Sequence, residues 1–167
     1  MTLPIHNVMQ LNKNSTINDK SICVIGIGIV LKSDDGIGHY ICDQLKKRLS
    51  NDISIQKINK LDQIDTLFYS NCKLLIIAES VKENNQKDVW IYPVNETTLP
   101  FCEQSNHFSP EQIKTIAAHL YTAQIPVFVC AVKGYNFEIG THLSEAAIAN
   151  AERAINLIAE MIKKKQL

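Results

Sequence analysis

Three acidic residues stand where two apolar segments of this chain give way to polar ones. Asp34 and Asp35 follow the run SICVIGIGI, and Glu79 ends the run LLIIAE. If both runs are strands of a parallel sheet, these acids reach its carboxyl edge, where sites form in such sheets. Carboxylates facing one crevice are suited to metal binding or to general acid and base chemistry.

Each of these acids is also compatible with a purely structural role. Asp34 is suited to cap the helix that follows, and Asp35 complements the dipole of that helix. Glu79 is equally compatible with a solvated loop, because a buried carboxylate needs a partner. The residues alone leave both explanations open.

The glycines between the first strand and the first helix do not predict a nucleotide site. A dinucleotide-binding loop needs a third glycine where this chain has Leu31. Asp34 and Asp35 would also repel a pyrophosphate at the helix N-terminus. We therefore expect Gly26 and Gly28 to serve backbone geometry, letting another element pass close to the strand.

The hydrophobic pattern alternates between strands and helices. Short apolar runs predict strands, and apolar residues in helical spacing predict helices. The last helix has Ser144 as its cap and six residues inward: Ala147, Ile148, Ala151, Ile155, Ile158 and Ile162. The predicted strands are 21–29, 53–58, 73–80, 87–94 and 126–133, and the predicted helices are 36–49, 62–70, 109–122 and the one after Ser144.

This order predicts an α/β fold with three layers, α/β/α, in which a mainly parallel twisted sheet of about five strands is flanked by helices. Residues 1–20 are polar and lack a sustained period, so we expect a flexible N-terminal extension there. Residues 21–167 are expected to form a single domain. The five cysteines include no C-x-x-C pair and are expected to be mostly reduced core residues.

The composition excludes several classes of partner. The 17 basic residues balance 17 acidic ones, so net charge does not attract nucleic acid or an anionic membrane. The sequence has neither a membrane-spanning apolar run nor the pattern of a signal peptide. We expect a cytoplasmic monomer whose function depends on a specific site.

One segment resembles a known family. The run V-x-G-I-G-x-x-L-x-S-D-D-G-I-G at positions 24–38 is similar to the opening signature of the hydrogenase maturation endopeptidases. The resemblance continues through LLIIAES, SPEQI and G-x-x-L-S, and it spans about residues 21–163. It implies an endopeptidase that recognises the nickel-loaded precursor of a hydrogenase large subunit and removes its C-terminal peptide.

The resemblance also implies roles for particular residues. Asp35 matches the first metal-contacting acid of the family, and Glu79 matches the second, which is usually aspartate. Glu111 stands where the family usually has histidine, and His107, four residues earlier, is an alternative third ligand. Asp35 and Glu79 are thus the expected catalytic acids. Nickel is expected to be recognised in the substrate and not held as a tightly bound intrinsic cofactor.

Three departures from the family pattern motivate alternatives. Ile29 replaces an asparagine, the D-G-G after the second strand is missing, and Glu111 replaces the histidine. A catalytically impaired paralogue that acts as a binding or assembly factor would account for them. A remote alternative is a receiver-like signalling domain, suggested by acids after two strands and by Lys133 after the last one.

Overall fold

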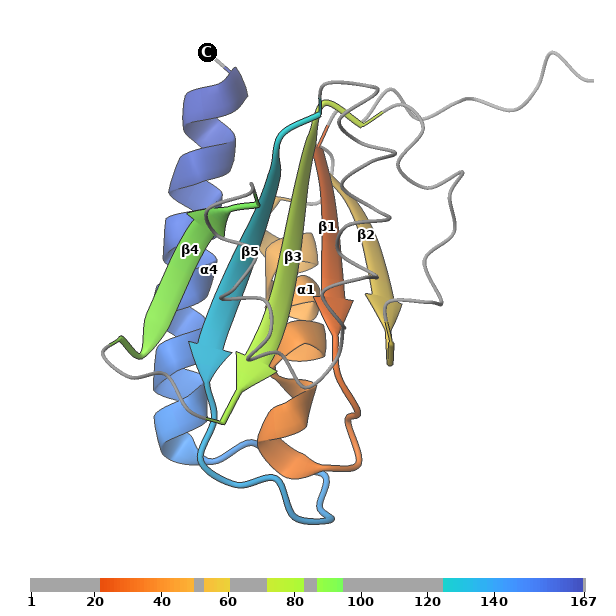
Figure 1. Ribbon diagram of the computed structural model, residues 1–167, viewed down its shortest axis with the longest axis vertical. Coiled ribbons are helices and arrows are strands. Elements are labelled where there is room, and N and C mark those ends of the chain that lie inside the picture. Colours follow the sequence, from red (N-terminus) through yellow and green to blue (C-terminus); the bar gives the residue numbers. More distant parts are fainter. Residues whose placement is uncertain (1–21, 50–52, 61–71, 83–86, 95–124, 167) are drawn as a thin grey trace, which may run out of the picture.

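The computed structural model of this chain describes residues 22–49, 53–60, 72–82, 87–94 and 125–166. The described chain runs from one strand into two helical segments, then through four strands to a long helix (Figure 1). The elements are β1 (Ile22–Ile27), the 3-10 helix η1 (Ser33–Gly36), α1 (Ile37–Arg48), β2 (Ile53–Ile58), β3 (Leu74–Val81), β4 (Val89–Pro93), β5 (Val127–Lys133) and α4 (Glu145–Gln166).

The five strands form one sheet in the order β2-β1-β3-β5-β4. The pairs β1 with β2, β1 with β3, and β3 with β5 are parallel, and the edge strand β4 runs antiparallel to β5. The prediction of an α/β fold with a mainly parallel sheet of about five strands is confirmed. The carboxyl ends of four strands therefore meet at one edge of the sheet.

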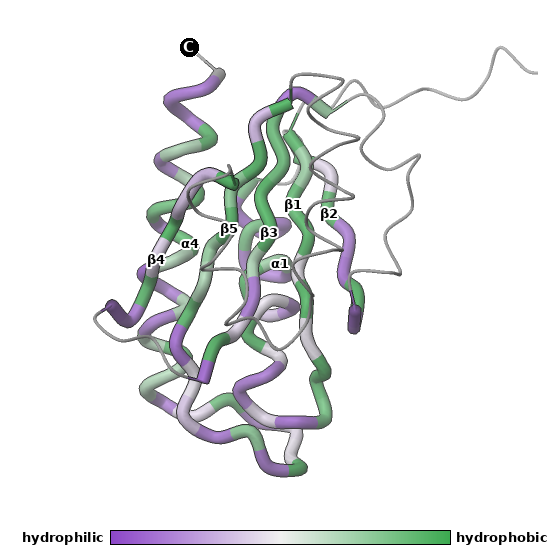
Figure 2. The backbone as a smooth tube through the Cα atoms, viewed as in Figure 1, coloured by the Kyte–Doolittle hydropathy of each residue, from purple (hydrophilic) through white to green (hydrophobic). Residues whose placement is uncertain are grey.

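The two faces of the sheet carry separate clusters of buried side chains. Helices α1 and α4 lie side by side on one face and bury residues such as Val24, Ile41 and Ile158 against it (Figure 1). The other face carries a second buried cluster that includes Ile25, Leu75 and Val129. Strands β1 and β3 are hydrophobic along most of their length (Figure 2), as expected for strands covered on both faces. The predicted helices 62–70 and 109–122 lie outside the described residues.

Two glycines allow α1 to pass very close to the sheet. A Cβ atom added to Gly26 would lie 2.3 Å from the carbonyl oxygen of Gly38, and one added to Gly38 would lie 2.5 Å from that of Ala78. These distances are far below van der Waals contact, so any side chain would push the helix away from the strand. The expected geometric role of Gly26 is thus confirmed.

The last helix begins where the sequence predicts. The hydroxyl of Ser144 accepts a hydrogen bond from the backbone N–H of Ala147 at 3.3 Å, which is the geometry of an N-terminal cap. Five of the six residues expected to face inward are fully buried: Ala147, Ala151, Ile155, Ile158 and Ile162. The prediction for Ile148 is wrong, because it falls at the margin of the buried stripe and is 36% exposed.

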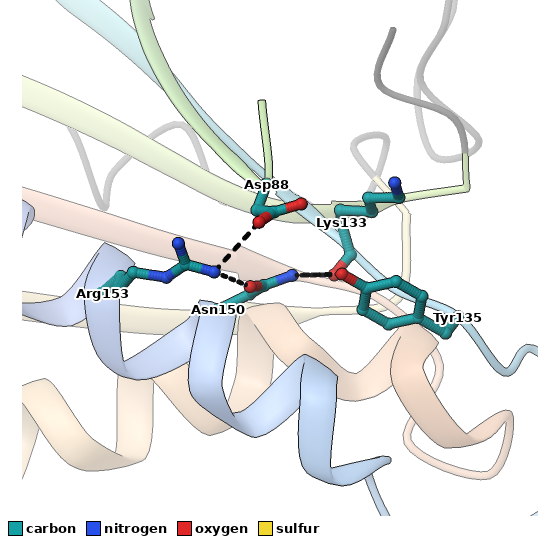
Figure 3. Close-up of polar contacts among 5 residues, drawn as sticks. All are labelled: Asp88, Lys133, Tyr135, Asn150 and Arg153. Carbon is teal, nitrogen blue, oxygen red and sulfur yellow. Dashed lines mark hydrogen bonds and ion pairs between the residues drawn. The ribbon is translucent and has the colours of Figure 1, made fainter. Parts of the chain in front are cut away.

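A polar network fastens α4 to the β4 edge of the sheet (Figure 3). The buried side chain of Asn150 donates to the carbonyl oxygen of Lys133 at 3.0 Å and to the hydroxyl of Tyr135 at 3.1 Å. Arg153 donates to the side-chain oxygen of Asn150 and to the carboxylate of Asp88. The network satisfies a buried amide and fixes the loop after β5 against the helix.

The four described cysteines are reduced and buried, as expected: Cys23, Cys42, Cys72 and Cys130. Burial raises the pKa of both Cys42 and Cys130 to about 12, so these two thiols are poor nucleophiles. Cys130 owes part of its shift to the nearby carboxylate of Glu79. Among the residues that the structure describes, no helix is long and apolar enough to cross a membrane.

Candidate functional site

A pocket of about 180 Å³ lies at the carboxyl edge of the sheet. Its lining comes from the segments after all four parallel strands: Ile29, Lys32 and Asp35 after β1, Asn59 and Lys60 after β2, Lys82 after β3, and Phe137 after β5. This is the position at which open parallel sheets form their sites. The pocket is therefore the candidate functional site of the described structure.

Asp35 is the carboxylate of this pocket. One of its oxygens accepts a hydrogen bond from the backbone N–H of Ile29 at 3.0 Å, and the other accepts one from the hydroxyl of Ser80 at 3.2 Å. The residue is only 6% exposed, and its carboxylate is held by these two hydrogen bonds at the wall of the pocket. A held carboxylate at the base of a pocket is suited to orient a ligand or accept a proton.

The neighbouring acid has a different role. Asp34 is fully buried and accepts hydrogen bonds from the backbone N–H groups of Tyr135, Asn136 and Ser144 and from the hydroxyl of Ser144, at 2.7 to 2.8 Å. Burial by itself would raise the pKa of this carboxyl, but the four hydrogen bonds outweigh it and hold the pKa below its ordinary value. Asp34 joins the loop after β1 to the start of α4.

The alternative in which Asp34 caps the helix after β1 is therefore wrong. No side-chain oxygen makes a capping hydrogen bond at the start of η1 or of α1. The reason lies in the segment after β5, which presents three N–H groups and a hydroxyl to the carboxylate. Four donors held in place by distant elements compete better than the N–H groups of one helical turn.

The backbone before the two acids is strained. Ser33 adopts a left-handed conformation with φ 49°, although it is not glycine. Its N–H donates to the carbonyl oxygen of Gly140 at 2.9 Å, and its hydroxyl donates to that of Glu138 at 3.0 Å. The loop after β5 thus holds the turn that directs Asp34 and Asp35 toward opposite partners.

Glu79 lies inside β3 and not at its end. The strand continues for two residues because β5 supplies pairing partners, Val132 for Ser80 and Lys133 for Val81. Glu79 is 1% exposed, and side-chain alternation places it on the sheet face of Ile77 and Val81, opposite the face of Ser80. Asp35 contacts Ser80, whereas Glu79 is absent from the described lining of the pocket.

The two other predicted metal ligands, His107 and Glu111, lie outside the described residues. Within the described ranges, no three residues among histidine, cysteine, aspartate and glutamate are placed to hold a metal ion. The pocket instead combines Asp35 with the side chains of Lys32, Lys60 and Lys82.

Sequence reasoning missed the lysines, Asn59, Phe137 and Ser80. Asn59, Lys60 and Lys82 directly follow apolar strands, so their positions relative to the strand ends could have indicated them. Ser80 was not identified as a site residue because the third predicted strand was expected to end there. Phe137 comes from a loop whose path depends on contacts with Asp34.

Comparisons with known proteins relate this architecture to solved structures. No family model matches the chain, and no curated protein matches it. The hydrogenase maturating endopeptidase HybD from E. coli superposes with a TM-score of 0.68 at 16% identity, over 86% of this chain and 93% of the other. The [NiFe] hydrogenase maturation protease HybD from Thermococcus kodakarensis gives 0.67 at 15%, over 84% and 98%.

A third solved structure agrees with these two. The hydrogenase 2 maturation peptidase from a Thaumarchaeota archaeon has a TM-score of 0.63 at 18% identity, and the match covers 86% of this chain and 98% of that one. This chain has the fold of the hydrogenase maturation proteases. The resemblance predicted from the segment 24–38 is confirmed at the level of the fold.

The hydrogenase maturation protease fold differs from that of a receiver domain. The receiver sheet has the strand order 2-1-3-4-5 with parallel strands. Here β4 lies at the edge beyond β5 and runs antiparallel to it. The side chain of Lys133 lies over the ring of Tyr135, 5.5 Å from its centroid, and is not among the lining residues of the Asp35 pocket. These features argue against the receiver-like alternative.

Proposed function

We propose that this chain is a divergent hydrogenase maturation endopeptidase that acts on the precursor of a hydrogenase large subunit. The observation that carries the proposal is the position of Asp35. It lies at the base of the carboxyl-edge pocket of a hydrogenase maturation protease fold, within the segment that resembles the opening signature of that family. Nickel enters this proposal as part of the substrate.

The proposed reaction is removal of a C-terminal peptide from the nickel-loaded precursor in the cytoplasm by a monomer. Asp35, already held by Ile29 and Ser80, contacts the incoming metal or the water that attacks the scissile carbonyl. Glu79 is the second acid of the proposed site. It is buried in β3 and lies on the sheet face opposite Ser80, so it acts on the substrate from that face. Glu111 or His107 is the third ligand to the metal in the substrate.

Processing of the precursor tests this function. The wild-type chain is mixed with a nickel-loaded large-subunit precursor from the same organism, and loss of the C-terminal peptide is followed by mass spectrometry. Asp35→Asn keeps the shape of the side chain: its oxygen still accepts from Ile29, and its NH₂ group donates to the Ser80 hydroxyl. We expect this variant and Glu79→Gln to fold normally and to lose processing. Processing that continues unchanged in both variants would overturn the assignment.

The third ligand needs its own comparison. Imidazole favours nickel more than a carboxylate does, so Glu111→His should strengthen binding of the nickel-loaded precursor. If His107 already supplies the imidazole, His107→Ala abolishes processing and Glu111→His adds little. Efficient nickel-dependent processing that tolerates His107→Ala would show that the carboxylate of Glu111 suffices.

A second function is favoured by one specific observation. Lys32, Lys60 and Lys82 line the same pocket as Asp35, and Asn59 and Lys60 occupy the place after β2 where the family has D-G-G. A pocket changed in this way suits an assembly factor that binds the precursor without cutting it. Co-purification of wild-type chain with an uncut, nickel-loaded precursor would favour this function over proteolysis.

A further inference from the structure

Aliphatic side chains are exposed on two loops at the carboxyl edge of the sheet. Val30 and Leu31, in the loop after β1, are 48% and 61% exposed, and Ile139, in the loop after β5, is 93% exposed. Both loops lie at the arrowhead end of the parallel strands (Figure 1). Single exposed aliphatic residues are common on protein surfaces, so the question is whether these three form one surface.

Two backbone hydrogen bonds join the loops. The N–H of Gly140 donates to the carbonyl oxygen of Leu31 at 3.0 Å, and the N–H of Ser33 donates to the carbonyl oxygen of Gly140 at 2.9 Å. Since Ile139 directly precedes Gly140, the backbones of Leu31 and Ile139 lie side by side. The three aliphatic residues therefore belong to one joined surface. We call Val30, Leu31 and Ile139 the apolar shelf.

The residue types on the shelf are unusual for their positions. A hydrogen bond from the N–H of Lys32 to the carbonyl oxygen of Ile29, at 3.0 Å, closes a tight turn whose two central residues are Val30 and Leu31. Central turn positions are dominated by Gly, Pro, Asn, Asp and Ser, which suit both the turn and the solvent. Exposed aliphatic residues break this local rule, and such departures are expected at functional sites.

The extent of the shelf indicates which kind of partner it fits. Three partly exposed aliphatic side chains offer at most roughly a few hundred Å², whereas a stable protein interface buries about 800 Å² on each partner. A second copy of this chain would therefore gain too little here. An extended polypeptide segment needs no more, because one or two of its aliphatic side chains are enough to cover the shelf.

The shelf is continuous with the carboxyl-edge pocket. Ile29 and Lys32, which flank Val30 and Leu31 in the chain, both line that pocket. The N–H of Ile29 also donates to the carboxylate of Asp35 at 3.0 Å. A polypeptide whose backbone reaches Asp35 therefore has the apolar shelf beside it.

We propose that the apolar shelf binds an extended segment of a polypeptide through one or two aliphatic side chains of that segment. The two loops are already joined by hydrogen bonds, so little conformational entropy is lost when the segment binds. The identity of the polypeptide as the hydrogenase precursor rests on the proposed function. In that case the shelf contacts residues next to the peptide bond that is cut.

The test uses the full-length wild-type chain and two uncharged peptides of similar shape, acetyl-Gly-Leu-Val-Gly-amide and acetyl-Gly-Asn-Thr-Gly-amide. Binding is followed in two-dimensional NMR spectra by shifts of the backbone amide signals of Leu31, Ile139 and Gly140. We expect the aliphatic peptide to bind about tenfold more tightly than the polar one, because it buries two aliphatic side chains in part. The preference should persist when the salt concentration rises from about 50 to about 500 mM, since no charge takes part.

Matched variants locate the contact. Leu31→Asn and Ile139→Thr keep a similar shape and make each side chain polar, so the double variant should bind the two peptides equally. Asn suits a central turn position, and Leu31→Asn should therefore not lower the melting temperature. Leu157→Asn makes the same change at a leucine on α4 that is 45% exposed, and it should leave the preference intact.

Three results would contradict the proposal. Equal binding of the two peptides to the wild-type chain would show that the shelf does not select aliphatic side chains. A preference that survives in the double variant would place the contact elsewhere. Shifts of the three amide signals that follow protein concentration, without peptide, would show that a second copy of this chain covers the shelf.

Affinity for the precursor separates this proposal from the proposed function. We expect the double variant to bind the nickel-loaded precursor about tenfold more weakly than the wild type. If the shelf selects the aliphatic peptide but the wild-type chain neither binds nor cuts the precursor, the proposed function fails and the shelf assignment stands. If the wild type and the double variant bind and cut the precursor equally well, the function stands and the shelf is not its docking surface.

Discussion

Adjacent residues of the same type perform different tasks in this molecule. Asp34 holds the loop after β5 and the first turn of α4, and Asp35 faces the pocket. The family resemblance assigned Asp35 to the site, but nothing in the sequence indicated the structural partners of Asp34. The donors to Asp34 lie about 100 residues away along the chain, so the local sequence pattern cannot reveal them.

The first prediction concerns Asp34→Asn. At least one N–H or O–H donor would then face an NH₂ group, which costs about 1 to 3 kcal/mol for each unsatisfied buried donor. We therefore expect the free energy of unfolding at pH 7 to fall by at least this amount, measured in urea. The matched change Asp43→Asn removes an exposed ion pair with Lys57 and should cost about 1 kcal/mol or less.

The same carboxyl predicts a pH dependence. Because its pKa in the folded state lies below the ordinary value of 3.8, its stabilisation is complete above that value. It is lost as the pH falls through the lower, folded-state pKa, since the unfolded chain binds the proton first. Wild-type protein should therefore lose more stability on acidification below pH 3.8 than Asp34→Asn does. Parallel losses in the two proteins would refute this role for Asp34.

At the scale of elements, the hydrophobic pattern predicted every described strand and both α-helices, with differences only at their ends. It missed η1, because a turn of Ser-Asp-Asp-Gly has no apolar period. It also ended β3 near Glu79, since a charged residue normally marks the end of a buried strand. Pairing with β5 overrode that rule, which sequence alone cannot show.

The second prediction belongs to the turn between β1 and η1. Gly28 has φ +147°, and a Cβ atom there would lie 1.8 Å from the carbonyl oxygen of Asp35. Gly28→Ala should lower the free energy of unfolding by about 3 kcal/mol or more, because both the backbone and the turn must move. Gly36→Ala is the matched control, since its nearest neighbour would be the Cα atom of Val30 at 3.3 Å. We expect urea unfolding to show a loss of about 1 kcal/mol or less for this control.

A comparable loss in the two glycine variants would contradict this account of the turn. It would mean that any added methyl group in this segment is unfavourable, and not the contact with Asp35 in particular.

At the scale of the whole molecule, the described fold is organised around β1. This strand pairs with β2 on one side and β3 on the other from its first residue, since Ile22 is opposite both Ile53 and Leu74. All six of its residues are buried. The sequence predicted this buried strand, because the polar composition changes abruptly to an apolar run near Ser21.

The last prediction uses that boundary to separate extension from domain. Deleting residues 1–18 removes none of β1, so we expect the melting temperature to change by about 2 °C or less. Deleting residues 1–24 also removes Ile22, Cys23 and Val24, which are 3%, 1% and 0% exposed. Losing those buried side chains and their pairing with two strands should cost several kcal/mol and lower the melting temperature by about 10 °C or more, or prevent folding. The two truncations differ by six residues, so calorimetry on both locates the start of the cooperative unit. A large drop already at the shorter deletion would show that residues 1–18 contribute to the core, and the domain would then begin well before Ser21.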